Sequence, residues 1–138
     1  MLRTIPIDPI LEKGYNVRLL VKDFDGLINT WSARSEKFRS TVDSSLNCQY
    51  DEGEKNKLDL FRCGKPNAPL YVFVHGGYWQ RGDKSVYSFI AESFVKSGID
   101  VALIGYQFCP QSSMTAIVVI IRTALIWLWK NARNYSIS

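Results

Sequence analysis

The chain contains 138 residues, of which 46% are hydrophobic and 22% are charged, a composition typical of one soluble globular domain. Its net charge of +4 is small, and its lysines and arginines are scattered rather than gathered between exposed aromatic residues. These features argue against nucleic-acid binding and leave enough chain to bury a hydrophobic core.

The N-terminal segment is predicted to be mostly helical. Residues 1–20 are too polar, and too often interrupted by proline and glycine, for a secretory leader, so we expect a cytoplasmic protein. Residues 8–22 predict an irregular arm with a short helical piece. Residues 23–39 predict an amphipathic helix whose apolar stripe consists of Phe24, Leu27, Ile28, Trp31 and Phe38.

A β-hairpin is predicted next. The stretches Asn47–Tyr50 and Lys57–Phe61 flank the polar turn Asp51–Asn56, and Leu58 and Leu60 alternate with charged neighbours. This alternation predicts a strand with one face in solvent and the other face on the core.

The cysteines give no sign of disulfides or metal binding. Cys48, Cys63 and Cys109 are odd in number and widely spaced, which favours small buried side chains in a reducing compartment. Because the chain also has a single histidine, we expect no zinc site or other metal centre.

After residue 69 the pattern becomes that of a parallel α/β sheet. Leu70–Val74 and Ile99–Tyr106 are continuous apolar runs, as expected of strands covered on both faces. Between them, Lys84–Ser97 predicts a helix that Asp83 caps and Gly98 ends. Two strands joined by a helix predict a right-handed βαβ unit. We therefore predict an α/β fold in which the hairpin precedes a parallel βαβ unit, with helices on both faces of an incomplete sheet.

A further helix is predicted over residues 113–131, and it is unusually apolar. Ala116–Ile121 and Ala124–Trp129 are separated only by Arg122 and Thr123. A membrane span needs about 20 apolar residues, and a central arginine is costly in lipid. We expect a helix buried against the sheet, with a membrane anchor as the alternative.

The strongest functional signal follows the strand over residues 70–74. The turn His75-Gly76-Gly77-Tyr78-Trp79 lies at the carboxyl end of that strand, where such sheets bind ligands. Adjacent glycines allow tight backbone geometry and leave amide N–H groups uncovered. In ester and amide cleavage the carbonyl oxygen becomes an oxyanion, which such groups stabilise. The candidate catalytic groups are therefore the amides of Gly76, Gly77 and Tyr78, as an oxyanion-hole loop.

The same residues also allow purely structural interpretations. A strand-to-helix turn can require glycine for its geometry alone. In hydrolases built on a parallel α/β sheet, the histidine of the catalytic triad comes after the nucleophile and the acid in the sequence. We therefore interpret His75 as a loop-shaping residue. Trp79 is predicted either to line a substrate pocket or to wedge the loop against the core. For Gln80–Ser85, a solvated turn with a helix cap is favoured over a substrate contact.

The sequence resembles the kynurenine formamidase (arylformamidase) branch of the α/β-hydrolases, in the esterase/lipase-like group. The resemblance rests on His75–Trp79, which matches a His-Gly-Gly-x-Trp motif, and on Asp83–Ser85 and Phe89–Glu92. It extends over roughly residues 14–135 and includes Leu58–Phe61, Tyr106, Cys109–Pro110 and Ala124–Trp129. It implies a Ser-Asp-His hydrolase without metal or organic cofactor that cleaves N-formyl-L-kynurenine or related aryl formamides and esters.

The sequence departs from this family in one respect, because no Gly-x-Ser-x-Gly follows the helix over 113–131. Ser136 and Ser138 lack flanking glycines, so we expect neither to be the nucleophile, and we expect nucleophile, acid and base all to be absent. The prediction is a single truncated domain, residues 1–138, with a helical arm over 1–40 and a partial sheet with helices over 45–138. Alone it should be inactive.

The alternative is a non-catalytic remnant, or an interaction partner that completes its sheet with another chain. An open sheet edge favours such pairing, and a homo-oligomer is its simplest form. A small formamide or ester would be the substrate only of the complete fold, and no nucleic acid or metal is expected to bind.

Overall fold

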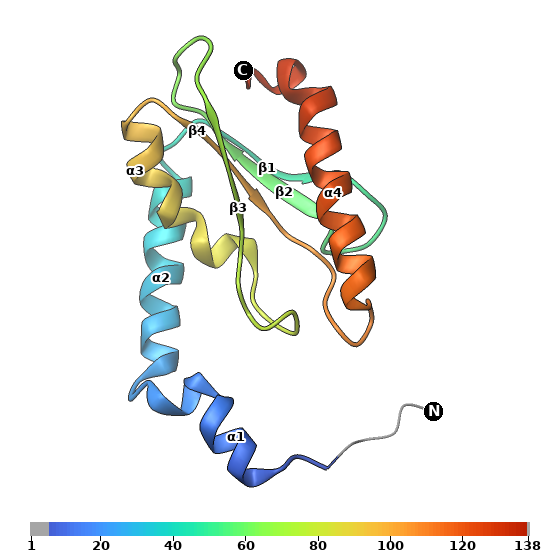
Figure 1. The fold of residues 1–138 in the computed structure, drawn as a ribbon. Coiled ribbons are helices and arrows are strands. Elements are labelled where there is room, and N and C mark those ends of the chain that lie inside the picture. Colours follow the sequence, from blue (N-terminus) through green and yellow to red (C-terminus); the bar gives the residue numbers. More distant parts are fainter. Residues whose placement is uncertain (1–5, 138) are drawn as a thin grey trace.

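The computed structural model describes residues 6–137, so the first five residues of the predicted arm and Ser138 lie outside it. Its four strands form one mixed sheet in the order β1-β2-β4-β3 (Figure 1). The strands are β1 (Ser44–Gln49), β2 (Lys57–Phe61), β3 (Leu70–Val74) and β4 (Asp100–Ile104). The α-helices are α1 (Pro9–Tyr15), α2 (Phe24–Arg39), α3 (Ala91–Lys96) and α4 (Met114–Asn131). Three 3₁₀ helices complete the chain, η1 (Val17–Leu20), η2 (Lys84–Ile90) and η3 (Ala132–Tyr135).

The strand pairing confirms the predicted α/β fold. β1 and β2 form the antiparallel hairpin, and β2 also pairs antiparallel with β4. β3 pairs parallel with β4, with Val72 opposite Ala102, as expected for a βαβ unit. β4 therefore lies between two strands that precede it in the chain.

Helices cover both faces of the sheet (Figure 1), and each face has its own hydrophobic core. On one face α4 contributes Ala124 and Leu128, which pack against side chains of β2 and β4: Leu58, Leu60, Ala102 and Ile104. On the other face α2 and α3 contribute Phe38 and Ala91, which pack against Phe61, Val101 and Leu103. β2 and β4 are the central strands and supply both cores.

Two burial predictions are wrong, for one reason. β2 was expected to have one solvated face, yet all four residues from Leu58 to Phe61 are buried. β3 was expected to be covered on both faces, yet Tyr71 and Val74 are exposed. The cause is the strand order, which places β2 inside the sheet and β3 at its edge.

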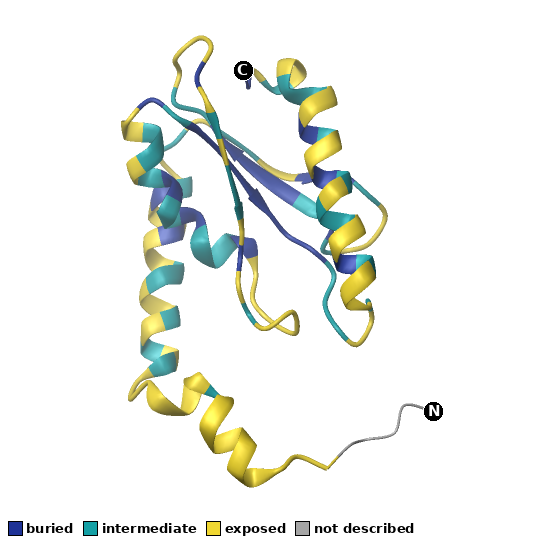
Figure 2. Ribbon diagram, viewed as in Figure 1, coloured by how far each residue is buried: buried dark blue, intermediate teal, exposed yellow. Residues whose placement is uncertain are grey.

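The predicted helix over residues 23–39 is confirmed as α2. Asp23 caps its N-terminus, because the Asp23 side chain accepts a hydrogen bond from the Gly26 N–H. Of its predicted apolar stripe only Phe38 is buried, and Leu27 is exposed. The helix packs along η2, whereas α1 and η1 contain no buried residue (Figure 2). The N-terminal residues thus contribute to the core only from α2 onward.

The helix predicted over Lys84–Ser97 lies where expected, but its first half is a 3₁₀ helix. The Ser35 hydroxyl of α2 donates to the Val86 carbonyl (2.7 Å) and accepts from the Phe89 N–H (3.0 Å). In an α-helix both backbone groups would be used within the helix itself. The contact with α2 therefore replaces regular α-helical bonds in η2.

The predicted apolar helix is confirmed as α4, with Ser113 capping its first turn. The expectation that it is buried holds only for a narrow stripe, Ile117, Ala124 and Leu128, while Trp129 is 89% exposed (Figure 2). The run Met114–Tyr135 is long and apolar enough to cross a membrane by length and composition, a test that core helices of soluble proteins also pass.

Candidate active site

The loop that follows β3 has an unusual backbone. Gly77, Tyr78 and Trp79 all have positive φ angles, of 133°, 56° and 57°. The N–H groups of Gln80 and Arg81 both donate to the Gly77 carbonyl at 3.1 Å, which closes the turn. Positive φ at two consecutive non-glycine residues is strained, and such strain clusters at functional sites.

Gly77 is the position in the His75–Trp79 motif where glycine is required. A Cβ atom there would lie 1.8 Å from the Arg81 carbonyl oxygen, so no side chain fits without moving backbone. A Cβ on Gly76, in contrast, would meet no atom of the described residues within 4 Å. The two glycines of the motif are therefore not equivalent.

His75 lies at the entry of the loop and is 3% exposed. Its Nδ1–H donates to the Gly76 carbonyl (2.7 Å), and its own carbonyl accepts from the Tyr106 hydroxyl (2.8 Å). The imidazole stacks on Tyr106 with ring centroids 4.7 Å apart. Nε2 has no hydrogen-bond partner among residues 6–137. The contacts hold the ring on backbone and aromatic neighbours; the role of His75 stays a prediction.

Burial lowers the pKa of His75 below its usual value of about 6.5, and the hydrogen bond to Gly76 acts in the opposite direction. The unfolded chain then binds a proton at a higher pH than the folded chain, so stability is complete above about pH 6.5 and falls as the pH drops below it. We expect the melting temperature to decrease between pH 7.5 and 5.5, and less so in His75→Asn. The single imidazole resonance gives a direct check by NMR; titration at or above pH 6.5 would contradict the prediction.

The candidate oxyanion-hole amides make no hydrogen bond to any of residues 6–137. In the described part of the chain, no hydrogen bond uses the N–H of Gly76, Gly77 or Tyr78 as donor. These three residues line a cavity of about 580 Å³ with Val74, Trp79 and an apolar face of α4 that consists of Met114, Ile117, Val118 and Ile121. Free donors beside an apolar cavity suit the stabilisation of a developing negative charge, because low polarity strengthens the interaction.

Both aromatic residues of the motif lie at this cavity. Tyr78 is 70% and Trp79 46% exposed, so neither ring is wedged into the core. The Trp79 carbonyl accepts from the Cys109 N–H at 2.8 Å, which ties the loop to the segment after β4. Arg122 of α4 also lines the cavity and places a cation there. From the sequence, this arginine was interpreted only as a residue that disfavours membrane insertion.

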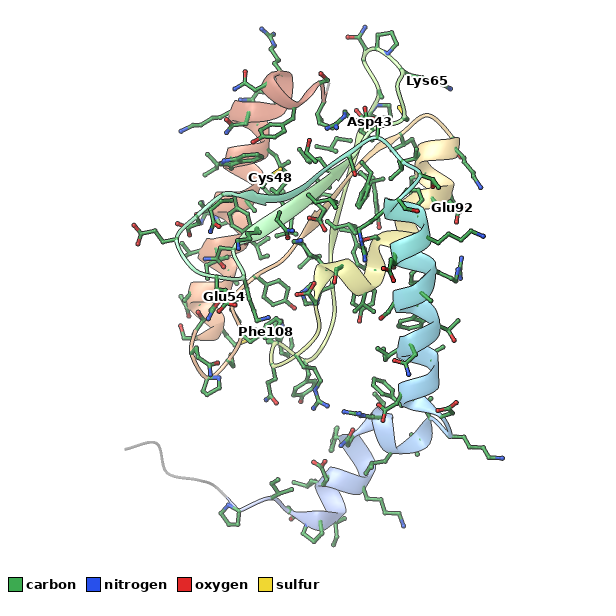
Figure 3. All side chains as sticks on the ribbon, turned by 180° about the vertical axis from the view of Figure 1, so that it is seen from behind. Asp43, Cys48, Glu54, Lys65, Glu92 and Phe108 are labelled. Atoms are coloured by element: carbon green, nitrogen blue, oxygen red, sulfur yellow. The ribbon has the colours of Figure 1, made fainter. Side chains whose placement is uncertain are left out.

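A second, more polar hollow of about 800 Å³ lies beside the loop. It is lined by Lys55, Gln80, Gln107, Phe108, Cys109, Pro110 and Gln111. Figure 3 shows Phe108 near one end of the sheet and Lys65 near the other. The chain segments that border the loop at this end are therefore the β1–β2 turn and the residues after β4.

Ser136 is far from the loop. It follows η3, at the opposite end of α4 from the residues that line the cavity, and α4 alone is about 27 Å long (Figure 1). Ser138 lies outside the described residues. Within residues 6–137 the three cysteines are unpaired, and no cluster of three or more histidine, cysteine or acidic side chains occurs.

A buried charged group lies next to the loop and was not predicted from the sequence. The turn after Trp79 is solvated up to Asp83, which caps η2 by accepting from the Ser85 N–H (2.9 Å). Lys84, however, is buried and forms an ion pair with the buried Asp59 of β2 (2.7 Å). The one available signal was an aspartate in the middle of the apolar stretch Leu58–Phe61.

Comparison with known proteins identifies relatives over much of the chain. A family model described as BD-FAE matches residues 58–138. The kynurenine formamidase of Drosophila melanogaster is 37% identical over 97 residues, 69% of this chain and 31% of the relative. That of Danio rerio is 30% identical over 101 residues, 72% of this chain and 34% of the relative. A crystal structure from Silicibacter sp., provisionally assigned as a thioesterase, matches with a TM-score of 0.81 and 32% identity.

The chain spans about a third of the length of these curated relatives. The match to the Silicibacter structure covers 93% of this chain and 48% of that one. The described sheet therefore corresponds to part of a larger fold.

Proposed function

The chain belongs to the BD-FAE family and has the fold of the N-terminal portion of an α/β-hydrolase, and from this premise we propose that its loop forms the oxyanion hole of a formamidase or esterase. The observation that carries the proposal is that the N–H groups of Gly76, Gly77 and Tyr78, beside the apolar cavity, have no hydrogen-bond partner within residues 6–137. The names of the curated relatives support an aryl formamide, of the N-formylkynurenine type, as substrate.

In this proposal a serine attacks the formamide or ester carbonyl carbon, the C–N or C–O bond breaks and the protonated amine or alcohol leaves. Water then hydrolyses the resulting acyl-enzyme and releases the carboxylic acid. The carbonyl oxygen then carries negative charge, and the loop amides donate hydrogen bonds to it. Loss of one such donor typically slows the reaction by about 10²–10³-fold. In this proposal His75 is not the general base, because a base needs Nε2 within reach of the nucleophile, whereas this imidazole is 3% exposed and stacks on Tyr106 and Tyr87.

The test combines the purified polypeptide 1–138 with a hybrid enzyme. In the hybrid, the corresponding residues of this chain replace the matched 97-residue stretch of the Drosophila kynurenine formamidase. We expect no hydrolysis of N-formylkynurenine or p-nitrophenyl butyrate above buffer by residues 1–138, and clear turnover of N-formylkynurenine by the hybrid.

The parental Drosophila enzyme serves as the positive control, and circular dichroism shows whether the hybrid is folded. A folded hybrid without turnover would contradict the proposed role of the loop. Turnover by the polypeptide 1–138 itself would contradict its expected inactivity.

A further inference from the structure

A buried ion pair joins the centre of the sheet to the exit of the loop. Lys84 Nζ lies 2.7 Å from Asp59 Oδ1, and the two side chains are 8% and 2% exposed. Asp59 lies in the middle of β2, and Lys84 is the first residue of η2, directly after the loop. Neither residue takes part in the chemistry proposed above.

Asn47 completes the network from β1. Its side-chain oxygen accepts from Lys84 Nζ (2.8 Å), and its backbone N–H donates to Asp59 Oδ1 (2.7 Å). Asn47 has a φ of 56° and lies where the register of β1 against β2 shifts, between Ser45 and Cys48. This irregularity in β1 turns both polar groups of Asn47 toward the ion pair.

The network is directly connected to the oxyanion-hole loop. Gly82, two residues before Lys84, packs so closely on the loop entry that a Cβ there would lie 2.9 Å from both Gly76 O and His75 Nδ1. The Lys84 side chain also passes close to Gly105, which follows β4. The exit of the loop thus lies against its entry at Gly82, two residues from the bonded Lys84.

Stability alone does not explain a buried ion pair. Removing two charges from water is costly, and well-packed apolar side chains of similar volume are often equally or more stabilising. The charges instead make the geometry specific, because the hydrogen bonds of Lys84 fix one position of its Nζ atom.

We propose that Lys84, held by Asp59 and Asn47, is a positioning residue that keeps the amides of Gly76, Gly77 and Tyr78 aimed at the cavity. The inference rests on the proposed function of the loop. Lys84 acts through the backbone and touches no reacting atom.

The test separates loop order from stability. Lys84→Met alone leaves Asp59 buried without its partner and should lower the melting temperature by about 10 °C or more. The double variant Asp59→Leu with Lys84→Met should recover most of that loss. We expect the loop of the double variant to be disordered even so, with ¹⁵N order parameters of Gly76, Gly77 and Tyr78 that fall from about 0.85 in the unmodified chain to below about 0.6.

In the hybrid enzyme the double variant should reduce kcat at least tenfold and change KM less than twofold. The matched control is Glu92→Gln with Lys96→Gln, which removes an exposed ion pair of the same 2.7 Å length on α3 and should change neither readout. Figure 3 shows Glu92 on the outer side of the molecule.

Asn47→Gly provides a second variant in case the double variant does not fold. Glycine suits the positive φ and leaves the ion pair in place while removing one bond to Lys84, so we expect a smaller fall in the same order parameters. Unchanged order parameters in the folded variants would overturn the proposal, as would an unchanged kcat in an active hybrid. The order parameters are measured on residues 1–138, so an inactive hybrid would contradict the proposed function without affecting this test.

Discussion

Gly77→Ala should disrupt the loop more than the addition of a methyl group at any other position in it. The new Cβ would collide with the Arg81 carbonyl, and the φ of 133° is one that alanine rarely adopts. We expect a loss of about 2–4 kcal/mol in the free energy of unfolding, or a rearranged loop if the collision is relieved locally. In the hybrid enzyme, kcat/KM for N-formylkynurenine should fall about 100-fold or more, because the amides would no longer be aimed together.

Gly76→Ala is the matched control for stability. Its Cβ would enter open space, and Gly76 does not have a positive φ, so the melting temperature of residues 1–138 should change by no more than a few degrees. Chemical denaturation monitored by circular dichroism measures both variants. Equal destabilisation by the two substitutions would show that the close approach of Gly77 to Arg81 does not determine the loop geometry.

Leu58→Ala should destabilise the chain strongly from the centre of the sheet. Leu58 is 0% exposed and packs in the core that β2 and β4 form with Ala124 and Leu128 of α4. Truncating a buried leucine in this way costs about 3–5 kcal/mol, which includes the cavity left behind. For a chain of this size the melting temperature should fall by roughly 10 °C or more.

Leu46→Ala, the matched control, removes the same side-chain atoms from a position where they contribute little to the free energy of unfolding. Leu46 lies on the edge strand β1 and is 43% exposed, so we expect a loss below about 1 kcal/mol. The comparison measures how much stability the α4 face supplies although most of α4 is uncovered. Similar losses in both variants would mean that the core between β2 and α4 is not formed in solution.

Local sequence patterns were sufficient to find the elements but not their places in the sheet. The apolar run over residues 70–74 correctly predicts a strand, and the parallel pairing with residues 100–104 follows from the helix between them. The burial of each strand depends on its neighbours, which come from distant parts of the chain. Leu58–Phe61 alternates like a half-solvated strand because Asp59 is charged, yet Asp59 is buried by its partner Lys84.

The same distinction applies to the candidate site. The position of the loop could be predicted because the motif His75–Trp79 follows directly on a strand. The network that surrounds it could not, since Asn47, Asp59 and Lys84 lie on three elements whose contact depends on the strand order. The different demands on Gly76 and Gly77 also require coordinates, because the two differ in φ and in their distance from the Arg81 carbonyl.

The strand order has a consequence for the chain as it leaves the ribosome. β2 and β3 emerge before β4, the strand that lies between them in the sheet. A nascent chain that ends before residue 100 can form the β1–β2 hairpin but offers β3 no native neighbour. During that interval the apolar segment from Leu70 to Val74 is exposed to mispairing, and chaperones that bind extended apolar segments would have their natural target there.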